Sequence, residues 1–507
     1  MTSAHKARIT AALEAVGVEP FPELSALSAR DNVRVEVVGS LTPVGSSGER
    51  ARRVFRHAQV RIVAPIVALL ALVGSIASVL GLFSSSGPAH VPIRRMSGDL
   101  NVAVAAFTTD GRVAPAGLAL AQAVANSLRK SLGHLDRSVA IEVRGPEAEA
   151  TGGLLAHPVS SPVKARTIAR QLAADIIVYG AINVTPDSTN VSPTFFLNAT
   201  KLPSAAPVTG PYGYGPALHS AFSIEISPQA RAELRSTLVA RTAAYASAFI
   251  GVGYYLRHSL RRAALYLHAA SRHAPPALLP LFEILLGNID AQKGATQAAL
   301  HKYERAAGDP TLHTRAELGI GEVRYAKSRG RCRSSDIRAS GLDAARRNFV
   351  QAARSAAREG APVSELLWAK ARFGLGQVDL CASSAGVIPN WTRTRDEFLD
   401  VVHSYSPSLA ELRDDTAEAH AGIGLCDLSS EQPPTSYVDA YREYGAAAGL
   451  TTRRDRAAYF YGAAAFAAEK LGDYTTASRD YRRAAHLTAS RSESRAYTDA
   501  AATNEHR

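Results

Sequence analysis

Cysteine is scarce in this sequence. The 507 residues hold three, Cys332, Cys381 and Cys426, and all of them lie in the C-terminal half. No two form a CxxC pair or have the spacing of a zinc site, so the sequence predicts neither a metal centre nor a redox motif. A chain outside the cytoplasm could form one disulfide, and the odd count would leave one thiol over. We interpret the cysteines as free and buried, and whether any two pair stays open.

Recognisable catalytic motifs are also absent. The sequence contains no HExxH, no GxSxG and no paired-carboxylate motif, and its fifteen histidines are scattered. His268 and His273 lie five residues apart, so they do not share a helix face well. The acidic pairs Asp396-Glu397 and Asp414-Asp415 are interpreted as surface charges or helix caps. We therefore predict that the protein is not an enzyme and uses no cofactor.

Acidic residues are fewer than basic ones, 45 against 57, which gives a formal charge of +12. The arginines do not form one basic tract, and several occur as short doublets on separate predicted helices, such as Arg261-Arg262 and Arg453-Arg454. No aromatic-interleaved platform accompanies them. We interpret them as solvated helix faces and predict no nucleic-acid partner.

One long stretch has no charge at all. Ile62 to Phe83 reads IVAPIVALLALVGSIASVLGLF, and at 1.5 Å per residue it makes about 33 Å of helix, enough to cross a bilayer. Five arginines precede it, at positions 50, 52, 53, 56 and 61, whereas Arg94 and Arg95 follow only after a polar linker. The positive-inside rule then predicts a cytoplasmic tail over 1–58, a transmembrane helix over 59–84 and an extracytoplasmic remainder.

The region 98–225 alternates between strand and helix patterns. Strands are predicted over 101–107, 138–143, 176–182 and 194–200. Apolar stripes from Leu118 to Leu132 and from Ala165 to Leu172 predict the helices between them, with Gly133 as the end of the first. This order predicts a small α/β domain with a mainly parallel sheet and an antiparallel hairpin at its end. The glycines of GPYGYG, Gly210, Gly213 and Gly215, are interpreted as a turn and not as a phosphate cradle.

The segment 172–182, LAADIIVYGAI, precedes the predicted hairpin. Together with the element order, this junction of Ala-Asp, apolar strand and glycine resembles the amino-terminal α/β domain of TolB-type periplasmic proteins. The resemblance implies that the domain serves in protein contacts and carries out no chemistry.

From about residue 240 a different spacing begins. Gly251 is followed by Ala263 and Ala270, and Gly287 starts the pattern again with Ala299, Tyr303 and Ala306. The spacing resembles the tetratricopeptide repeat, in which small residues lie where two helices cross and the period is near 34 residues. Further units begin at Gly319, with its second helix displaced to 345–352 behind an inserted loop, at 366–405 in a degenerate form, and at Gly422. A last unit shows the turn Gly472-Asp473-Tyr474, followed by Ala477, Tyr481 and Ala484.

This resemblance implies a superhelix of helix pairs over 230–490, followed by a polar tail over 491–507. In tetratricopeptide proteins the concave groove is lined by the first helix of each pair, just after the crossing glycine. Carried over by position, the resemblance points to Tyr255, Asn288, Gln292 and Arg324 as the partner-binding groove, with Val252 and Ile320 beside them. The polar members would hold a peptide backbone or carboxylate.

The predicted fold class is therefore α plus α/β, with a transmembrane helix, a small mainly parallel α/β domain and a C-terminal α-solenoid. The predicted function is that of a single-pass scaffold or adaptor that binds a protein or peptide partner at a bacterial cell envelope and contacts lipid through Ile62–Phe83. The alternative is a single-pass membrane sensor whose α/β domain binds a small ligand and signals through the tail. The sequence leaves open the partner, the pathway, the oligomeric state and the role of the tail.

Overall fold

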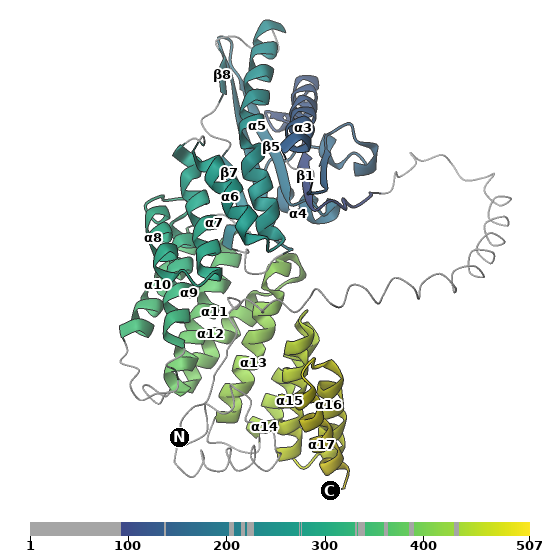
Figure 1. Cartoon of the computed structure of the whole chain (residues 1–507). Coiled ribbons are helices and arrows are strands. Elements are labelled where there is room, and N and C mark those ends of the chain that lie inside the picture. Colours follow the sequence, from purple (N-terminus) through teal and green to yellow (C-terminus); the bar gives the residue numbers. More distant parts are fainter. Residues whose placement is uncertain are drawn as a thin grey trace, which may run out of the picture.

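The computed structural model describes a two-part molecule, an α/β domain joined to a curved stack of helices (Figure 1). The described residues are 93–135, 138–201, 207–213, 218–220, 228–272, 274, 276–329, 332, 340–358, 363–384, 390–429 and 435–506. The tail predicted over 1–58 and the span Ile62–Phe83 lie outside them. Within these ranges no helix is both long and apolar enough to cross a membrane.

The sheet was predicted to be mainly parallel, but it is mixed: among the described strands three pairs are parallel and four are antiparallel. β1 (Leu100–Val104) lies between β4 (Ile141–Arg144), at one edge of the sheet, and β5 (Ile176–Val184), and it pairs in parallel with both. The next strand, β6 (Thr189–Leu197), runs antiparallel to β5 and forms the predicted hairpin. Two short strands, β2 (Thr108–Thr109) and β3 (Arg112–Val113), extend the sheet beside β5.

β2 and β3 were not predicted, and neither were two further strands. β7 (Gly210–Gly213) and β8 (Leu218–Ser220) both pair with β6. The interpretation of Gly210 and Gly213 as a turn is therefore wrong, because both residues take part in β7. Gly215 lies outside the described residues. A four-residue edge strand that contains two glycines has no hydrophobic periodicity from which it could be predicted.

Helices cover both faces of the sheet. α3 (Pro115–Leu135) lies on one face and α4 (Pro162–Leu172) on the other. Side chains alternate along β1 accordingly: Leu100 and Val102 belong to the core under α3, whereas Ala103 belongs to the core under α4. The Ser161 hydroxyl accepts a hydrogen bond from the Lys164 amide and caps α4. α3 continues past Gly133, so the predicted end of this helix is two residues early.

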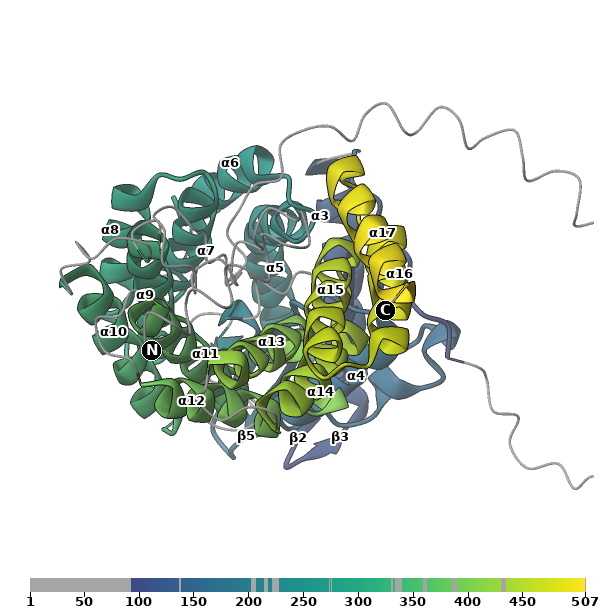
Figure 2. The same cartoon turned by 90° about the horizontal axis from the view of Figure 1, so that it is seen from below.

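The remaining helices form a solenoid of consecutive antiparallel pairs. Their bounds are α5 (Pro228–Leu256), α6 (Leu260–Ser271), α7 (Leu279–Gln292), α8 (Thr296–Ala306), α9 (His313–Arg329), α10 (Ser340–Ala356), α11 (Val363–Ser384), α12 (Trp391–Ser404), α13 (Arg413–Ser429), α14 (Thr435–Leu450), α15 (Arg454–Lys470), α16 (Tyr474–Leu487) and α17 (Arg491–Glu505). Figure 2 shows α7, α9, α11, α13 and α15 on the inner side of the curve and α8, α10, α12 and α14 on the outer side. The predicted crossing residues Ala263, Ala299 and Ala477 are fully buried.

Glycines of the inner helices receive large side chains from the outer ones. The ring of Tyr303 on α8 lies between Gly287 of α7 and Gly319 of α9, and a Cβ at either glycine would come within 2.8 Å of that ring. The same arrangement recurs with Phe349 of α10 between Gly321 and Gly374, and with Phe398 of α12 between Gly376 and Gly422. One outer ring thus fixes the spacing of two successive inner helices, and this contact repeats along the stack.

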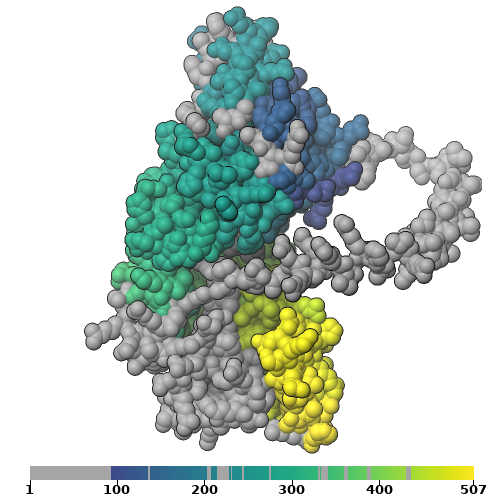
Figure 3. Space-filling view, viewed as in Figure 1, coloured from purple at the N-terminus to yellow at the C-terminus, as the bar shows by residue number. Residues whose placement is uncertain are grey.

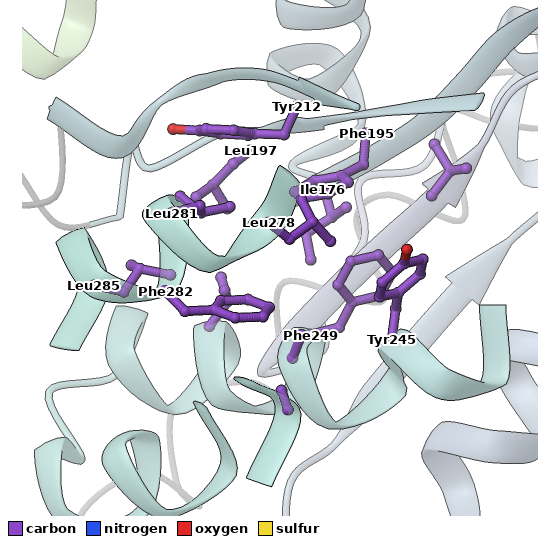
Figure 4. Packing of buried hydrophobic residues seen from close by; sticks show 14 of the residues in the cluster. Ile176, Phe195, Leu197, Tyr212, Tyr245, Phe249, Leu278, Leu281, Phe282 and Leu285 are labelled. Carbon is purple, nitrogen blue, oxygen red and sulfur yellow. The ribbon is translucent and has the colours of Figure 1, made fainter. Parts of the chain in front are cut away.

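The α/β domain and the first helix pairs share one hydrophobic core. Figure 4 shows Phe195 of the sheet beside Phe249 of α5, and Leu278, Leu281 and Phe282 packed on the same side. The rings of Phe195 and Phe249 lie 5.6 Å apart, edge to face. The space-filling view shows the α/β domain and the first helices as one continuous body (Figure 3). The predicted boundary at 225–230 therefore falls at the start of a helix that belongs to both parts.

Two further predictions are corrected. Residues 491–505 were predicted to be part of a polar tail, but they form α17, whose Tyr497 is buried against Gly462 of α15. Cys332 and Cys381 were interpreted as free, but they form a disulfide with a Cα–Cα distance of 5.1 Å. Cys426 is free and buried, as expected.

Candidate partner-binding surface

The inner layer of the solenoid carries buried charges that are paired between neighbouring helices. Lys370 of α11 donates to Asp415 of α13 over 2.6 Å. Arg456 of α15 holds Glu418 of α13 in a bidentate pair at 2.7 and 2.6 Å. Because each pair joins two successive inner helices, these contacts set the spacing of the inner layer and leave little charge to offer a ligand.

Glu322 of α9 extends this series of charges. Burial raises its pKa to about 7, although the Lys370 ammonium lowers it, and the Asp415 carboxylate raises it further. Burial alone would lower the pKa of Lys370, but Asp415, Glu322 and Glu411 outweigh that effect and raise it. Buried charged side chains are therefore present on four inner helices, α9, α11, α13 and α15. Glu322 lies at the α9 end of this series and has a pKa near neutral pH.

The structure brings three of the predicted groove residues together, as an internal network. The Asn288 side-chain amide donates to the Tyr255 hydroxyl at 3.0 Å, and the Tyr303 hydroxyl donates to the Asn288 carbonyl oxygen at 2.5 Å. Gln292 also bonds to Tyr255, whose pKa is raised by burial. Tyr255 is fully buried, so it offers no surface to a partner and the role of amphipathic anchor does not fit it.

Arg324 lies apart from this network. Its guanidinium donates to Asn348 of α10 at 2.8 Å and lies 4.0 Å from the Glu304 carboxylate of α8. Its side chain is 36% exposed. Of the four predicted residues, Asn288, Gln292 and Arg324 are half-buried, whereas Tyr255 is fully buried.

A cleft in the solenoid was not predicted. It has a volume of about 550 Å³ and lies between the first turns of α11 and the turn that follows α12. The cleft is lined by Glu365, Trp368, His403 and Tyr405. The Arg372 guanidinium lies 5.5 Å from the centre of the Trp368 ring. A few polar groups beside aromatic faces are typical of small-molecule and peptide sites. The sequence feature that could have pointed to this cleft is Trp368, one of only two tryptophans in the chain. It lies in the unit at 366–405 that was interpreted as degenerate.

A cluster of metal ligands is not found in the described part of the chain. Two buried carboxylates of the inner layer, Asp415 and Glu418, instead form ion pairs with Lys370 and Arg456. Cys426, the described cysteine outside the disulfide, is buried, and burial raises the pKa of its thiol. These groups are therefore poorly suited to act as nucleophiles at neutral pH.

Comparison with known proteins does not identify a family for this chain. No family model matches the chain, and no curated protein matches it. Among solved structures, "Crystal Structure of the Apo Form of RapI" is similar over 54% of this chain and 75% of that chain, with 11% identity and a TM-score of 0.38. A likeness at this level carries no information on function.

Proposed function

We propose that the protein is a non-catalytic, membrane-anchored scaffold that binds a protein or peptide partner through its solenoid, which is of the tetratricopeptide type. The observation that carries the proposal is the repeated contact between inner glycines and outer rings, because it builds a curved stack with an extended inner surface. Scaffolds of this kind present such surfaces to partners without chemistry of their own.

The anchoring part of the proposal rests on the sequence. Ile62–Phe83 would span the bilayer, with the arginine-flanked tail in the cytoplasm and residues from 93 onward outside. The disulfide Cys332–Cys381 supports this orientation, since disulfides persist mainly in oxidising compartments.

We place the partner on the solenoid, at Gln292 and Arg324 and in the cleft beside Trp368. The cleft offers aromatic faces for an apolar side chain, and Glu365 and His403 are exposed beside them. Arg324 would pair with a partner carboxylate, because a guanidinium can hold a carboxylate through two parallel hydrogen bonds.

Photo-crosslinking tests this placement. A photoreactive amino acid is introduced at Arg324, Glu365 or His403 of the full-length protein, and at the exposed Arg347 of the outer helix α10 as a matched control. We expect Arg324, Glu365 and His403 to give the same crosslinked partner and Arg347 to give none. Crosslinks that are as strong at Arg347 would argue against binding at Arg324 and in the cleft beside Trp368.

Reporter fusions test the topology. A periplasm-dependent reporter fused after residue 507 should be active, and a cytoplasm-dependent one should be inactive. The opposite result would place the solenoid in the cytoplasm and refute the proposed orientation.

A further inference from the structure

A groove between α3 of the α/β domain and α5 of the solenoid shares no lining residue with the cleft beside Trp368. α3 and α5 lie side by side, as both Figure 1 and Figure 2 show, and the turns that face each other leave a hollow of about 600 Å³. Its lining residues recur at helical spacing on both helices: Leu120, Ala123 and Ser127 on α3, and Ala232, Ser236 and Val239 on α5. The Ser127 hydroxyl donates to the Val239 carbonyl at 3.3 Å and joins the two helices there.

The side chains of this α3–α5 groove give it an apolar floor and a basic rim. Alanine, leucine and valine form most of the floor, and the charged lining residues are Lys130, Arg231 and Arg235. α3 contains no acidic residue, and the one acid of α5, Glu233, does not line the groove. A partner that fills the groove would therefore carry apolar side chains flanked by acids.

The dimensions of the groove favour a helix. Its lining runs from Ala119 to Lys130 on α3 and from Pro228 to Val239 on α5. At 1.5 Å per residue each side is roughly 17 Å long, about three helical turns. Side chains at i, i+3, i+4 and i+7 of a third helix would pack between the ridges of the other two. A flat bilayer surface would not enter such a hollow.

We propose that the α3–α5 groove binds an acidic amphipathic helix of about three turns from a partner protein. The apolar face of that helix fills the floor, and its carboxylates pair with Lys130 and Arg235. This second docking surface goes beyond the proposed function of the solenoid and would let the protein join two partners.

The test uses full-length protein in detergent and two synthetic peptides with the same leucine pattern. One carries glutamate beside the leucines and the other carries lysine, and fluorescence anisotropy measures the binding of each. The charge-reversal variant is Lys130→Glu with Arg235→Glu, and Ala119→Trp at an exposed lining position fills the groove. Lys164→Glu on α4, on the opposite face of the sheet, is the matched control.

We expect the glutamate peptide to bind the wild type and the Lys164→Glu control equally. Charge reversal should weaken this binding at least tenfold and let the lysine peptide bind, and Ala119→Trp should weaken it without reversing the charge preference. Circular dichroism checks that each variant is folded. Equal binding of the two peptides to the wild type, or unchanged binding in both groove variants, overturns the proposal. Anionic phospholipid vesicles that bind through Lys130 and Arg235 while the glutamate peptide does not would overturn it in favour of lipid.

Discussion

Glycine defines this solenoid at the level of single residues. Phe398 is fully buried, and its ring lies between two inner glycines, close enough that a Cβ at Gly376 would be 2.6 Å and one at Gly422 2.4 Å from it. Because both edges of the ring are enclosed, the ring has no direction in which to move. Small residues at these positions are therefore required for packing, whatever their helix propensity.

Gly422→Ala should lower the free energy of unfolding by about 1–3 kcal/mol, since its methyl group overpacks the Phe398 ring. Gly445→Ala on α14 is the matched control, because a Cβ there meets nothing within 4 Å. Replacing that glycine should stabilise the protein by up to about 1 kcal/mol. Chemical denaturation measures both. A Gly422→Ala variant as stable as Gly445→Ala would show that the ring does not enclose this position.

Glu322 makes the stability of the solenoid depend on pH. Burial raises its pKa from 4.5 to about 7 in the folded state, so its protonated form is favoured by folding. Its contribution to stability is complete below pH 4.5 and is lost as the pH rises through about 7, where the folded protein must ionise a buried acid. Lys370 and Asp415, which also act on Glu322, stay in place when Glu322 is changed.

Glu322→Gln removes this ionisation. We expect the variant to gain stability relative to the wild type as the pH rises from 4.5 to 7, with the difference levelling off above that range. Thermal unfolding at a series of pH values measures the difference. A constant difference between wild type and variant over this range would mean that Glu322 does not titrate there.

At the scale of elements, the sequence pattern predicted which helix pairs exist better than it predicted the contacts between them. Ala345, Phe349 and Ala352 were assigned to a second helix displaced by a loop, and all three are buried in α10. The unit at 366–405 was interpreted as degenerate, yet Gly374 and Gly376 contact outer rings just as Gly422 does. Gly374 contacts the ring of Phe349 on α10, and Gly376, two residues later, contacts the ring of Phe398 on α12. The tetratricopeptide pattern used for the prediction has one crossing glycine per unit and therefore misses the second contact.

Other elements could not be predicted because long-range contacts decide them. α17 has a polar sequence, and its few apolar side chains, such as Tyr497, Ala500 and Ala501, are enough to cover the last pair. Tyr255 occupies the position that lines the groove in the tetratricopeptide pattern, but hydrogen bonds from Asn288 and Gln292 accompany its burial. Residue spacing alone predicts neither the formation of α17 nor the burial of Tyr255. The first depends on packing against α15 and the second on hydrogen bonds from α7.

The disulfide joins the segment after α9 to α11 and bypasses α10. Its two cysteines are 49 residues apart, so Cys332→Ser should cost about 2–4 kcal/mol of stability under oxidising conditions. The buried Cys426, which is free, provides the matched control. A reducing agent should lower the stability of the wild type and of Cys426→Ser, and should leave Cys332→Ser unchanged. Equal sensitivity of all three proteins would contradict the pairing.

At the scale of the whole molecule, α5 belongs to both parts. Its first half places Leu234 and Leu238 in the core against the α/β domain, and its second half pairs with α6. Gly253 allows a close approach to the sheet, because a Cβ there would lie 3.2 Å from that of Leu100. A buried ion pair, Arg166 of α4 with Glu411 just before α13, joins the two parts again farther along the stack. The two parts should therefore depend on one another to fold.

Fragments measure this dependence. A fragment of 93–225 lacks α5 and leaves the face of the sheet under α3 only partly covered, so we expect it to bind a hydrophobic dye and to unfold without a cooperative transition. A fragment of 93–272 includes α5 and α6 and should unfold cooperatively. The same fragment with Leu234→Asp and Leu238→Asp has equal length but cannot cover the face, and it should behave like 93–225. If 93–225 unfolds as sharply and at the same temperature as 93–272, the α/β domain is autonomous and the shared core contributes little to its stability.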